Sequence, residues 1–446
     1  MCLFSRSVFI LAHQVNDINF YNYYNFLVKN QWRSRQDLEQ DQLKRLKGIV
    51  RFAYENVPYY HRIFKENHFS PDDINSLKDM EKIPVLTKDI IRNNYEDLKP
   101  INIDKIKYLT RGTGGSTGTP LQYRLDKKER FFMAAMMYRG WGYGGYELGD
   151  RTLFFGGSSI GTSVKNDALK RINERVRNIR MVSSFSMDDS ILNKYIDLIN
   201  NFKPKFIYGY PSSINLLASY VDKNNVQVHS PIGIFSTSEN LFSPVRRNIE
   251  NAFDTKVYNT YGLNDGGVTA FECNEHSGLH IDTERSYMEV VDDDHNQLSE
   301  GVGKILATSF GNYSMPFIRY DTGDYGDLID NNCECGRDYQ QLKDVVGRSV
   351  DILTTPDGKK VHGWLFLYIF WEYGKGIKNY QVVQRSIDKI CIYIVPDDDF
   401  DEIQMEKVRE IVNQRVGGWE IEYHYVDRIE FTSSGKNKFI INELIE

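Results

Sequence analysis

Hydrophobic and polar positions in the middle of the chain alternate in a way that predicts strands separated by helices. Short apolar runs such as Phe206–Tyr210 and Ile232–Thr237 are each followed by a helical pattern, as at Ser212–Val221. Strand–helix–strand alternation of this kind indicates a parallel sheet with crossover helices. Further helices are predicted at Asp37–Tyr54, Lys127–Arg139, Asp188–Asn201 and Ser243–Phe253, and further strands at Leu121–Leu125 and Lys256–Thr260.

The pattern changes after Asp265. Strand-like runs joined by turns follow, with little helix between them, at Val268–Glu272, Arg285–Val291, Gly303–Thr308 and Tyr325–Ile329. They predict a smaller antiparallel or barrel-like layer that closes the large domain. Beyond Asp351 the chain has a compact α+β pattern, with a helix predicted at Asp401–Arg415 between strands.

We therefore predict an α/β fold with two domains. A chain of 446 residues exceeds what one hydrophobic core usually supports. The expected large domain covers residues 1–350 and combines parallel-rich sheets and helices with a small antiparallel β subdomain. The expected small α+β domain covers residues 351–446.

Composition excludes several classes of protein. A content of 41% hydrophobic and 13% aromatic residues is typical of a globular protein and not of a disordered chain. The net charge of −6 gives no electrostatic reason to expect nucleic acid as a partner. The apolar run Val8–Ala12 is too short for a signal-peptide core or a membrane span, so we expect a cytoplasmic protein. Peripheral membrane association through the aromatic segment Phe20–Phe26 stays open as an alternative.

One loop combines glycines with hydroxyl side chains. Residues 113–120 read Thr-Gly-Gly-Ser-Thr-Gly-Thr-Pro and follow an apparent strand. Glycines let the backbone approach a polyanion, and hydroxyl and N–H groups donate hydrogen bonds to phosphate oxygens. The loop is not a Walker A sequence, because no Gly-Lys-Ser/Thr follows. A flexible surface turn is the alternative, but the ordered run Gly-Ser-Thr-Gly-x-Pro is more specific than composition. The predicted phosphate contacts are Thr113, Gly115, Ser116, Thr117 and Gly118.

Four later blocks follow this loop in a characteristic order: Tyr261-Gly-Leu-Asn-Asp265, Arg319-Tyr-Asp-Thr-Gly-Asp324, Gly347-Arg-Ser-Val-Asp351 and Ser434-Gly-Lys436. Their order resembles that of the adenylate-forming enzymes. From about residue 50 onward the chain is similar to the phenylacetate–coenzyme A ligase family, and within it to the branch associated with capsular polysaccharide biosynthesis. Any block alone is weak evidence, but several in register are strong. The resemblance implies a large AMP-binding domain and a small mobile domain that rotates at Asp351.

The resemblance also implies roles for the nucleotide-binding residues. Asp324 is similar to the family's ribose-binding carboxylate, although an aspartate in a β-turn is the alternative interpretation. Arg348 is expected to contact ribose or phosphate oxygens. Tyr261 resembles the residue that lies beside the adenine, with core packing as the alternative. Ser238 and Glu239 match the strand end that meets the adenine in the family.

Two charged residues are expected to serve catalysis. A carboxylate near a triphosphate can hold Mg²⁺, and Asp265 stands where the family usually has Glu, one methylene longer. The resemblance places Lys436 beside the α-phosphate, where a cation stabilises the negative charge of the transition state. Lys438 is the competing candidate, and a solvated terminal loop is the alternative interpretation of this segment.

The cysteines form a different kind of pattern. Five cysteines without a signal sequence argue against a disulfide framework. Cys273, Cys333 and Cys335 with one histidine could form a closed tetrahedral Zn²⁺ site of the structural kind. His276 and His280 are both near enough in sequence. Relatives carry the histidine in a Gly-x-His element, which favours His280. Reduced, buried cysteines beside surface histidines are the alternative.

Together these features predict an ATP-dependent ligase that activates a carboxylic acid as acyl-AMP, with release of pyrophosphate. The acyl group would pass to coenzyme A or another acceptor, and the capsule branch suggests a role in cell-surface polysaccharide biosynthesis. ATP, Mg²⁺, structural Zn²⁺ and coenzyme A are the expected cofactors. The alternative is a non-catalytic nucleotide-binding or scaffold protein of a polysaccharide-assembly complex. It is motivated by Asp265 in place of Glu and by Leu121 where many relatives carry Lys.

Overall fold

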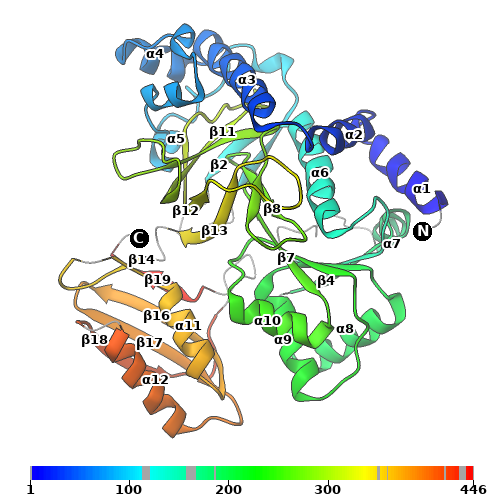
Figure 1. Cartoon of the computed structure of the whole chain (residues 1–446), viewed down its shortest axis with the longest axis vertical. Coiled ribbons are helices and arrows are strands. Elements are labelled where there is room, and N and C mark those ends of the chain that lie inside the picture. The colour runs from blue at the N-terminus through cyan, green and yellow to red at the C-terminus, as the bar shows by residue number, and fades with distance from the viewer. Residues whose placement is uncertain are drawn as a thin grey trace.

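The computed structural model describes residues 3–112, 121–156, 167–184, 187–348, 352–358, 360–415, 418–430 and 438–444. In Figure 1 the helices of the N-terminal part (blue) lie at the top and right of the molecule, and the C-terminal part (orange to red) lies at the lower left. The N-terminal helices are α1 (Leu3–Gln14), α2 (Phe20–Asn30), α3 (Arg35–Asn56), α4 (Pro58–Glu66) and α5 (Lys88–Asn93). Short 3₁₀ turns lie at Pro71–Asp73, Leu77–Lys82, Ile103–Lys105 and Gly142–Gly144.

Local sequence explains where these helices begin. The hydroxyl of Ser34 accepts a hydrogen bond from the backbone N–H of Asp37 at 3.2 Å, which caps α3. Leu38, Leu46 and Ile49 recur on one face of α3 and are buried. Pro58 occupies the first turn of α4, where a missing N–H costs no hydrogen bond. These signals are local, so the sequence alone could indicate them.

In the described residues, eleven strands form one mixed sheet in the order β10-β11-β12-β13-β9-β8-β7-β6-β5-β3-β4. The parallel half contains β3 (Thr152–Gly156), β4 (Ile179–Ser183), β5 (Phe206–Gly209), β6 (Gly233–Ser236) and β7 (Lys256–Gly262). The antiparallel half contains β8 (Thr269–Glu272), β9 (Leu279–Ile281), β10 (Ser286–Val291), β11 (Gly301–Ser309), β12 (Tyr320–Ile329) and β13 (Gln341–Arg348). Strand β7 joins the halves, because it pairs in parallel with β6 and antiparallel with β8.

Crossover helices cover the parallel half. They are α8 (Asp189–Phe202), α9 (Pro211–Lys223) and α10 (Ser243–Phe253). Their apolar faces pack on the strands in one buried cluster, in which Ile196, Ile214 and Ile249 meet Ile207 and Ile234. Because each strand–helix–strand unit returns the chain to the same edge, the carboxyl ends of β5, β6 and β7 lie side by side.

A hairpin and a helix follow the N-terminal helices in the chain. Strands β1 (Tyr108–Gly112) and β2 (Gln122–Asp126) pair antiparallel and lead into α6 (Lys127–Trp141), and α7 (Asp167–Arg177) follows β3 in the chain. The carboxylate of Asp126 accepts from the backbone N–H of Lys128 at 2.9 Å and caps α6. At the other end of α6 the Trp141 ring stacks on Phe235 of β6, with ring centroids 5.2 Å apart.

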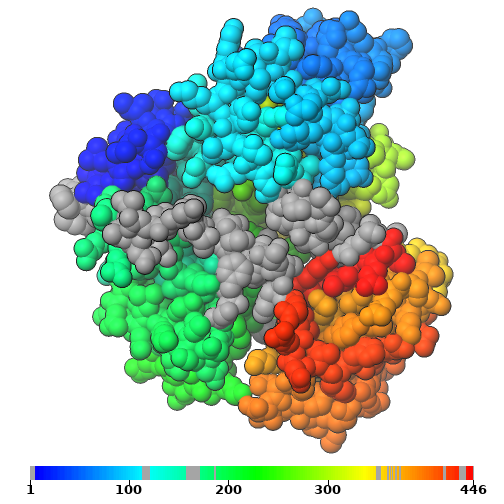
Figure 2. Space-filling view, turned by 180° about the vertical axis from the view of Figure 1, so that it is seen from behind, coloured from blue at the N-terminus to red at the C-terminus, as the bar shows by residue number. Residues whose placement is uncertain are grey.

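The C-terminal part has its own sheet, in the order β18-β17-β16-β19, and a two-stranded ladder of β14 and β15. Its elements are β14 (Ile352–Thr354), β15 (Lys360–His362), α11 (Trp364–Tyr373), β16 (Ile377–Ser386), β17 (Lys389–Pro396), α12 (Glu402–Arg415), β18 (Glu420–Tyr425) and β19 (Ile440–Asn442). Phe366, Val382, Ile392 and Val408 belong to a separate buried core. Seen from behind, the orange and red C-terminal part lies beside the green helices of the parallel half (Figure 2).

The predicted fold class is confirmed: an α/β protein with a large mixed sheet and a small separate C-terminal sheet. One detail differs, because the antiparallel strands continue the parallel sheet through β7 instead of forming a layer of their own. The sequence pattern did not predict helix α11, because Trp364–Tyr373 is apolar at almost every position and shows no helical period. The predicted domain boundary at residue 350 lies outside the described residues and stays a prediction. Among the described helices, none has the length and apolar character that crossing a membrane requires.

Candidate active site

Two of the sequence blocks meet at one place in the fold. The hydroxyl of Tyr261, at the end of β7, donates a hydrogen bond to Oδ2 of Asp324 on β12 at 2.9 Å. The hydroxyl of Tyr320, the first residue of β12, donates to Oδ2 of Asp265 at 2.8 Å. Each block thus supplies one tyrosine and one aspartate, and the two pairs cross between the blocks. The structure therefore brings Tyr261, Asp265 and Asp324 together, as the motif order predicted.

Burial fixes the protonation of the two phenols. Burial is the largest cause that raises the pKa of Tyr261 well above its ordinary value, and the neighbouring carboxylate of Asp324 is the next. Burial and then the charge of Asp265 raise the pKa of Tyr320 in the same direction. Both side chains consequently stay protonated and act as hydrogen-bond donors to the carboxylates. This pairing orients Asp265 and Asp324 before any ligand binds.

The β1–β2 hairpin reaches the same cluster. Burial and then the charge of Asp265 raise the pKa of Tyr123, which places this β2 side chain within the electrostatic reach of Asp265. Tyr123 pairs with Arg111 across the hairpin, one rung before the pair of Gly112 and Gln122 that ends the ladder. The glycine and hydroxyl loop joins these strands at that end. Its predicted contacts Thr113, Gly115, Ser116, Thr117 and Gly118 lie outside the described residues.

Some of the remaining predicted residues lie within the described part of the chain, and others do not. Lys436 and the hinge Asp351 lie outside the described residues. The competing Lys438 is described, and its carbonyl accepts from Nε2 of Gln381 on β16 at 2.7 Å. Arg348 ends β13, where its backbone is paired in register with Asp324. That register places the third block on β13, beside the strand that carries the ribose-binding candidate.

Ser238 and Glu239 follow β6 at the carboxyl edge of the parallel half. Ser238 has a φ of 65°, a left-handed conformation that is uncommon for a residue other than glycine. The carboxylate of Glu239 accepts from the backbone N–H of Ser212 at the start of α9, at 3.0 Å. Ligands of open α/β sheets bind in the crevice outside this edge. The neighbouring strand β7 leads from the same edge to Tyr261 and Asp265.

A buried ion pair that the motifs did not indicate lies behind the Asp265 loop. Nε of Arg285 is 2.6 Å from Oε1 of Glu129 in the first turn of α6, and both side chains are almost fully buried. Nη1 of Arg285 also donates to the carbonyl oxygen of Leu263, two residues before Asp265, at 3.2 Å. The Tyr261–Asp265 loop is therefore fastened to α6 through one guanidinium. A charged residue at the edge of a predicted strand carries no sequence signal for such a role.

The cysteines and one histidine form a compact cluster away from these carboxylates. Ligand atoms of Cys273, His280, Cys333 and Cys335 all lie within 4.8 Å of one another. Sγ of Cys273 is 3.6 Å from Sγ of Cys333, and Sγ of Cys335 is 3.4 Å from Nε2 of His280. Zinc bonds of about 2.3 Å to sulfur and 2.0–2.1 Å to nitrogen at tetrahedral angles separate such atoms by about 3.6–3.8 Å. The donor set and its spacing therefore fit a zinc ion.

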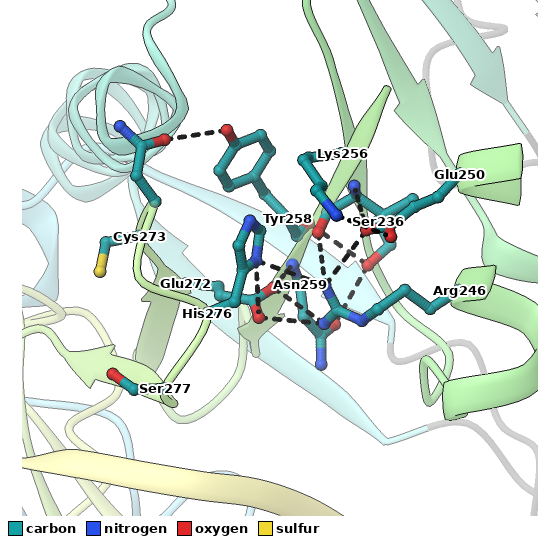
Figure 3. A network of polar contacts seen from close by, with 12 residues as sticks. Ser236, Arg246, Glu250, Lys256, Tyr258, Asn259, Glu272, Cys273, His276 and Ser277 are labelled. Carbon is teal, nitrogen blue, oxygen red and sulfur yellow. Dashed lines mark hydrogen bonds and ion pairs between the residues drawn. The ribbon is translucent and has the colours of Figure 1, made fainter. Parts of the chain in front are cut away.

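His276 belongs to a different network. Its Nδ1 lies 3.1 Å from Oε1 of Glu272, and Glu272 in turn accepts both Nη2 hydrogen bonds of Arg246 at 2.9–3.0 Å. Figure 3 shows the His276 ring beside Tyr258 and within this network, while the Cys273 thiol lies apart from it. Of the two candidate histidines, the structure places His280 in the cysteine cluster.

Comparisons with known proteins show what the chain is similar to. Residues 353–443 match the model of the CapK C-terminal domain. The chain is 28% identical to the protein CapK of Staphylococcus aureus over 92% of its own length and 91% of CapK. It is 26% identical to a phenylacetate–coenzyme A ligase of Thermus thermophilus, covering 85% of this chain and 86% of that protein. Over most of its length the chain is therefore similar to CapK and to phenylacetate–coenzyme A ligases.

A solved structure supports the fold of this chain. The crystal structure of 2-hydroxyisobutyryl-CoA ligase in its postadenylation state, in complex with R3-HIB-AMP, superimposes with a TM-score of 0.73. The match covers 92% of this chain and 91% of that chain at 19% sequence identity. The resemblance to the phenylacetate–coenzyme A ligase family and to CapK, which the motifs carried, is confirmed.

Proposed function

We propose that the cluster of Asp265 and Asp324 binds ATP and that the ligase converts a carboxylic acid into an acyl-AMP. A carboxylate oxygen of the acid attacks the α-phosphorus, the bond to the β-phosphate oxygen breaks, and pyrophosphate leaves with the electron pair. The observation that carries the proposal is the crossed pairing of Tyr261 with Asp324 and of Tyr320 with Asp265. It holds two carboxylates, from motifs far apart in the sequence, in fixed positions.

Each carboxylate has a separate task in this proposal. Asp324 would accept hydrogen bonds from the two ribose hydroxyls, while Tyr261 steadies it. Oδ1 of Asp265 has no hydrogen bond within the described part of the chain, whereas Oδ2 accepts from Tyr320. A hard cation such as Mg²⁺ takes one or two protein carboxylate oxygens together with phosphate oxygens, so Asp265 fits that role. When bound, Mg²⁺ would neutralise charge on the phosphates.

Lys436 would stabilise the developing charge on the α-phosphate. Removing one such electrostatic donor typically lowers a rate by about 10²–10³. We expect Asp324→Ala to weaken ATP binding more than it slows the chemical step, and Lys436→Ala to slow adenylation with little change in ATP binding. The measurement is acid-dependent exchange of labelled pyrophosphate into ATP, with a panel of carboxylic acids.

Matched variants accompany that experiment. Asp327 lies on the same strand as Asp324 but on its more exposed face, so Asp327→Ala should leave exchange unchanged. Lys438→Ala is the matched control for Lys436→Ala and should also leave exchange unchanged. If Lys438→Ala slows exchange instead, the competing lysine has the catalytic role. If Asp324→Ala and Lys436→Ala both exchange pyrophosphate at the wild-type rate, the assignment of the site is wrong.

We further propose that the acyl group passes to coenzyme A or to an amine or hydroxyl of a cell-surface sugar. The similarity to phenylacetate–coenzyme A ligases supports the first acceptor, and the similarity to CapK supports the second. Incubating the ligase with ATP and the acid that gives exchange, with and without coenzyme A, separates them. A thioester product identifies coenzyme A as the acceptor, while acyl-AMP that accumulates unchanged in its presence excludes it.

A structural zinc ion completes the proposal. Cys273, His280, Cys333 and Cys335 would bind it and pin the loop after β8 to the loop before β13. A closed four-ligand site has no position for substrate, so the ion would stabilise the fold and take no part in the reaction. We expect about one zinc per chain at these four residues, lost in Cys335→Ser and kept in His276→Gln. A folded protein that contains no zinc would contradict this part.

A further inference from the structure

Three side chains of metal-binding type converge on the small C-terminal sheet, away from both sites described above. Cys391 lies on β17, and Glu422 and His424 lie on the neighbouring strand β18. The parallel register places Cys391 directly opposite Glu422 and Tyr393 opposite His424. Alternation along β17 puts Cys391 on the face opposite to Ile390 and Ile392, which belong to the buried core. Register and alternation alone therefore bring the three side chains to one face.

The spacing of the ligand atoms is that of a coordination site. Oε2 of Glu422 is 3.7 Å from Sγ of Cys391 and 3.4 Å from Nε2 of His424, and the three atoms lie within 4.8 Å of one another. Zinc bonds of about 2.3 Å to sulfur and 2.0–2.2 Å to nitrogen or oxygen separate tetrahedral ligands by about 3.3–3.7 Å. Small side-chain rotations would bring all three atoms to a shared ion.

Neighbouring residues hold the ligands in place. Nζ of Lys389 lies 2.6 Å from Oε1 of Glu422, which leaves Oε2 directed at the cysteine and the histidine. The His424 ring stacks on Tyr393, with centroids 5.1 Å apart and planes at 23°. Outer contacts of this kind orient the ligands in metal sites. The charge of Lys389 opposes a cation, but about a third of this side chain is exposed, so solvent screens the repulsion.

We propose that Cys391, Glu422 and His424 form a second metal site, which binds Zn²⁺ or a similar divalent transition metal. A thiolate and an imidazole select such ions over Mg²⁺ and Ca²⁺, which prefer oxygen ligands alone. Glu422 and His424 keep 40% and 44% of their side chains exposed, so an ion can enter from solvent. Three protein ligands leave a fourth position for water or an external ligand. The site is independent of the proposed reaction and of the Cys273 cluster.

The test is a titration of the full-length protein with Co²⁺, a spectroscopic substitute for zinc. Zinc in the Cys273 cluster is left in place. Wild-type protein should bind one further equivalent and develop an ultraviolet band from sulfur-to-cobalt charge transfer. Cys391→Ser should lose the band, and His424→Asn should weaken binding at least about tenfold. Glu420→Gln, two residues before Glu422 on the same strand, is the matched control and should behave as wild type.

Two further variants keep the outcome decisive. Glu422→Gln replaces a half-exposed side chain and tests the site even if Cys391→Ser fails to fold. Cys335→Ser removes the other cluster and should leave the cobalt band intact. The proposal is overturned if wild type binds no more cobalt than Cys391→Ser or Glu422→Gln. It is equally overturned if the band disappears in Cys335→Ser but persists in Cys391→Ser.

Discussion

The tyrosine hydroxyls of Tyr261 and Tyr320 decide how the two motif aspartates are presented. Sequence reasoning selected Asp265, Asp324 and Tyr261, but it treated Tyr320 only as part of a motif. In the structure Tyr320 has the same kind of role as Tyr261, since each phenol donates to the aspartate of the other block. Asp265 is one methylene shorter than the usual glutamate, and the bond from Tyr320 shows that the shorter side chain is nonetheless held in a defined position.

His13 allows a prediction of pH dependence. This side chain is buried on α1, where its Nδ1–H donates to the carbonyl of Phe9 and its Nε2 accepts from the hydroxyl of Tyr138. Burial lowers the pKa of His13 from 6.5 to about 4. Below pH 6.5 the unfolded chain therefore binds a proton on His13 that the folded protein does not bind. The free energy of unfolding consequently decreases as the pH falls from 6.5 toward 4.

At pH 5 this linkage should cost about 2 kcal/mol of unfolding free energy relative to pH 7. Urea unfolding of wild type and of His13→Gln at both pH values measures it. Glutamine can keep one of the two hydrogen bonds but does not titrate, so the variant should lose less stability on acidification by that amount. An identical loss in both proteins would show that His13 does not govern the pH dependence.

At the scale of elements, the site depends on where strands end. The carboxyl ends of β5, β6 and β7 lie together because crossover helices return the chain to one edge, and β12 arrives from the antiparallel half of the same sheet. Strand β7, which joins the two halves of the sheet, therefore brings the motif of Asp265 beside the motif of Asp324. Helix α6 adds a second support, since Glu129 and Arg285 connect it to the carbonyl of Leu263.

This buried ion pair gives a prediction with an internal control. Arg285→Met alone leaves the Glu129 carboxylate buried without its partner, which typically costs about 3–5 kcal/mol of stability. The double variant Glu129→Gln with Arg285→Met removes both charges and should recover most of that loss. Because it lacks the donor to Leu263, it should still exchange pyrophosphate more slowly than wild type. Thermal unfolding and exchange, measured on both variants, separate the two effects.

Two other outcomes for the double variant would contradict this prediction. A double variant with wild-type exchange would show that the ion pair stabilises the fold and does not position the Asp265 loop. A double variant as unstable as Arg285→Met would show that the helix and the loop need the charges themselves.

At the scale of the whole molecule, the chain divides its core between two sheets. The large mixed sheet ends at β13, and the next strand, β14, already contributes Leu353 to the separate C-terminal core. Between described residues, an exposed ion pair of Lys223 with Asp397, 3.5 Å apart, connects the end of α9 to the C-terminal part. An exposed pair of this kind is worth about 0–1 kcal/mol, which leaves the small part able to change position.

We therefore predict that residues 1–350 fold without the C-terminal part. The fragment should bind ATP, because Asp265 and Asp324 are both within it, but it should not catalyse pyrophosphate exchange, because Lys436 is missing. Calorimetric titration with ATP and the exchange assay provide the two measurements. An insoluble or unfolded fragment would contradict the predicted boundary, and an active one would contradict the role of Lys436.

The sequence by itself determined the class of fold, the family resemblance and most of the candidate residues. Helices such as α10 were predicted at their observed bounds, because periodicity and capping are local properties. The motif blocks indicated Asp265 and Asp324 as candidates, and the cysteine spacing indicated three members of the cluster of Cys273, His280, Cys333 and Cys335. In each case the signal lies within a few neighbouring residues or in the order of recognisable blocks.

Only the tertiary structure decided which of these residues meet and what supports them. The bond from Tyr320 to Asp265, the fastening of Leu263 by Arg285 and the convergence of Cys391 with Glu422 and His424 join residues that are 22 to 55 positions apart in the sequence. Tertiary contacts also decide that the antiparallel strands continue the parallel sheet through β7. Such contacts depend on strand order, register and packing, which a local pattern of polar and apolar residues does not encode.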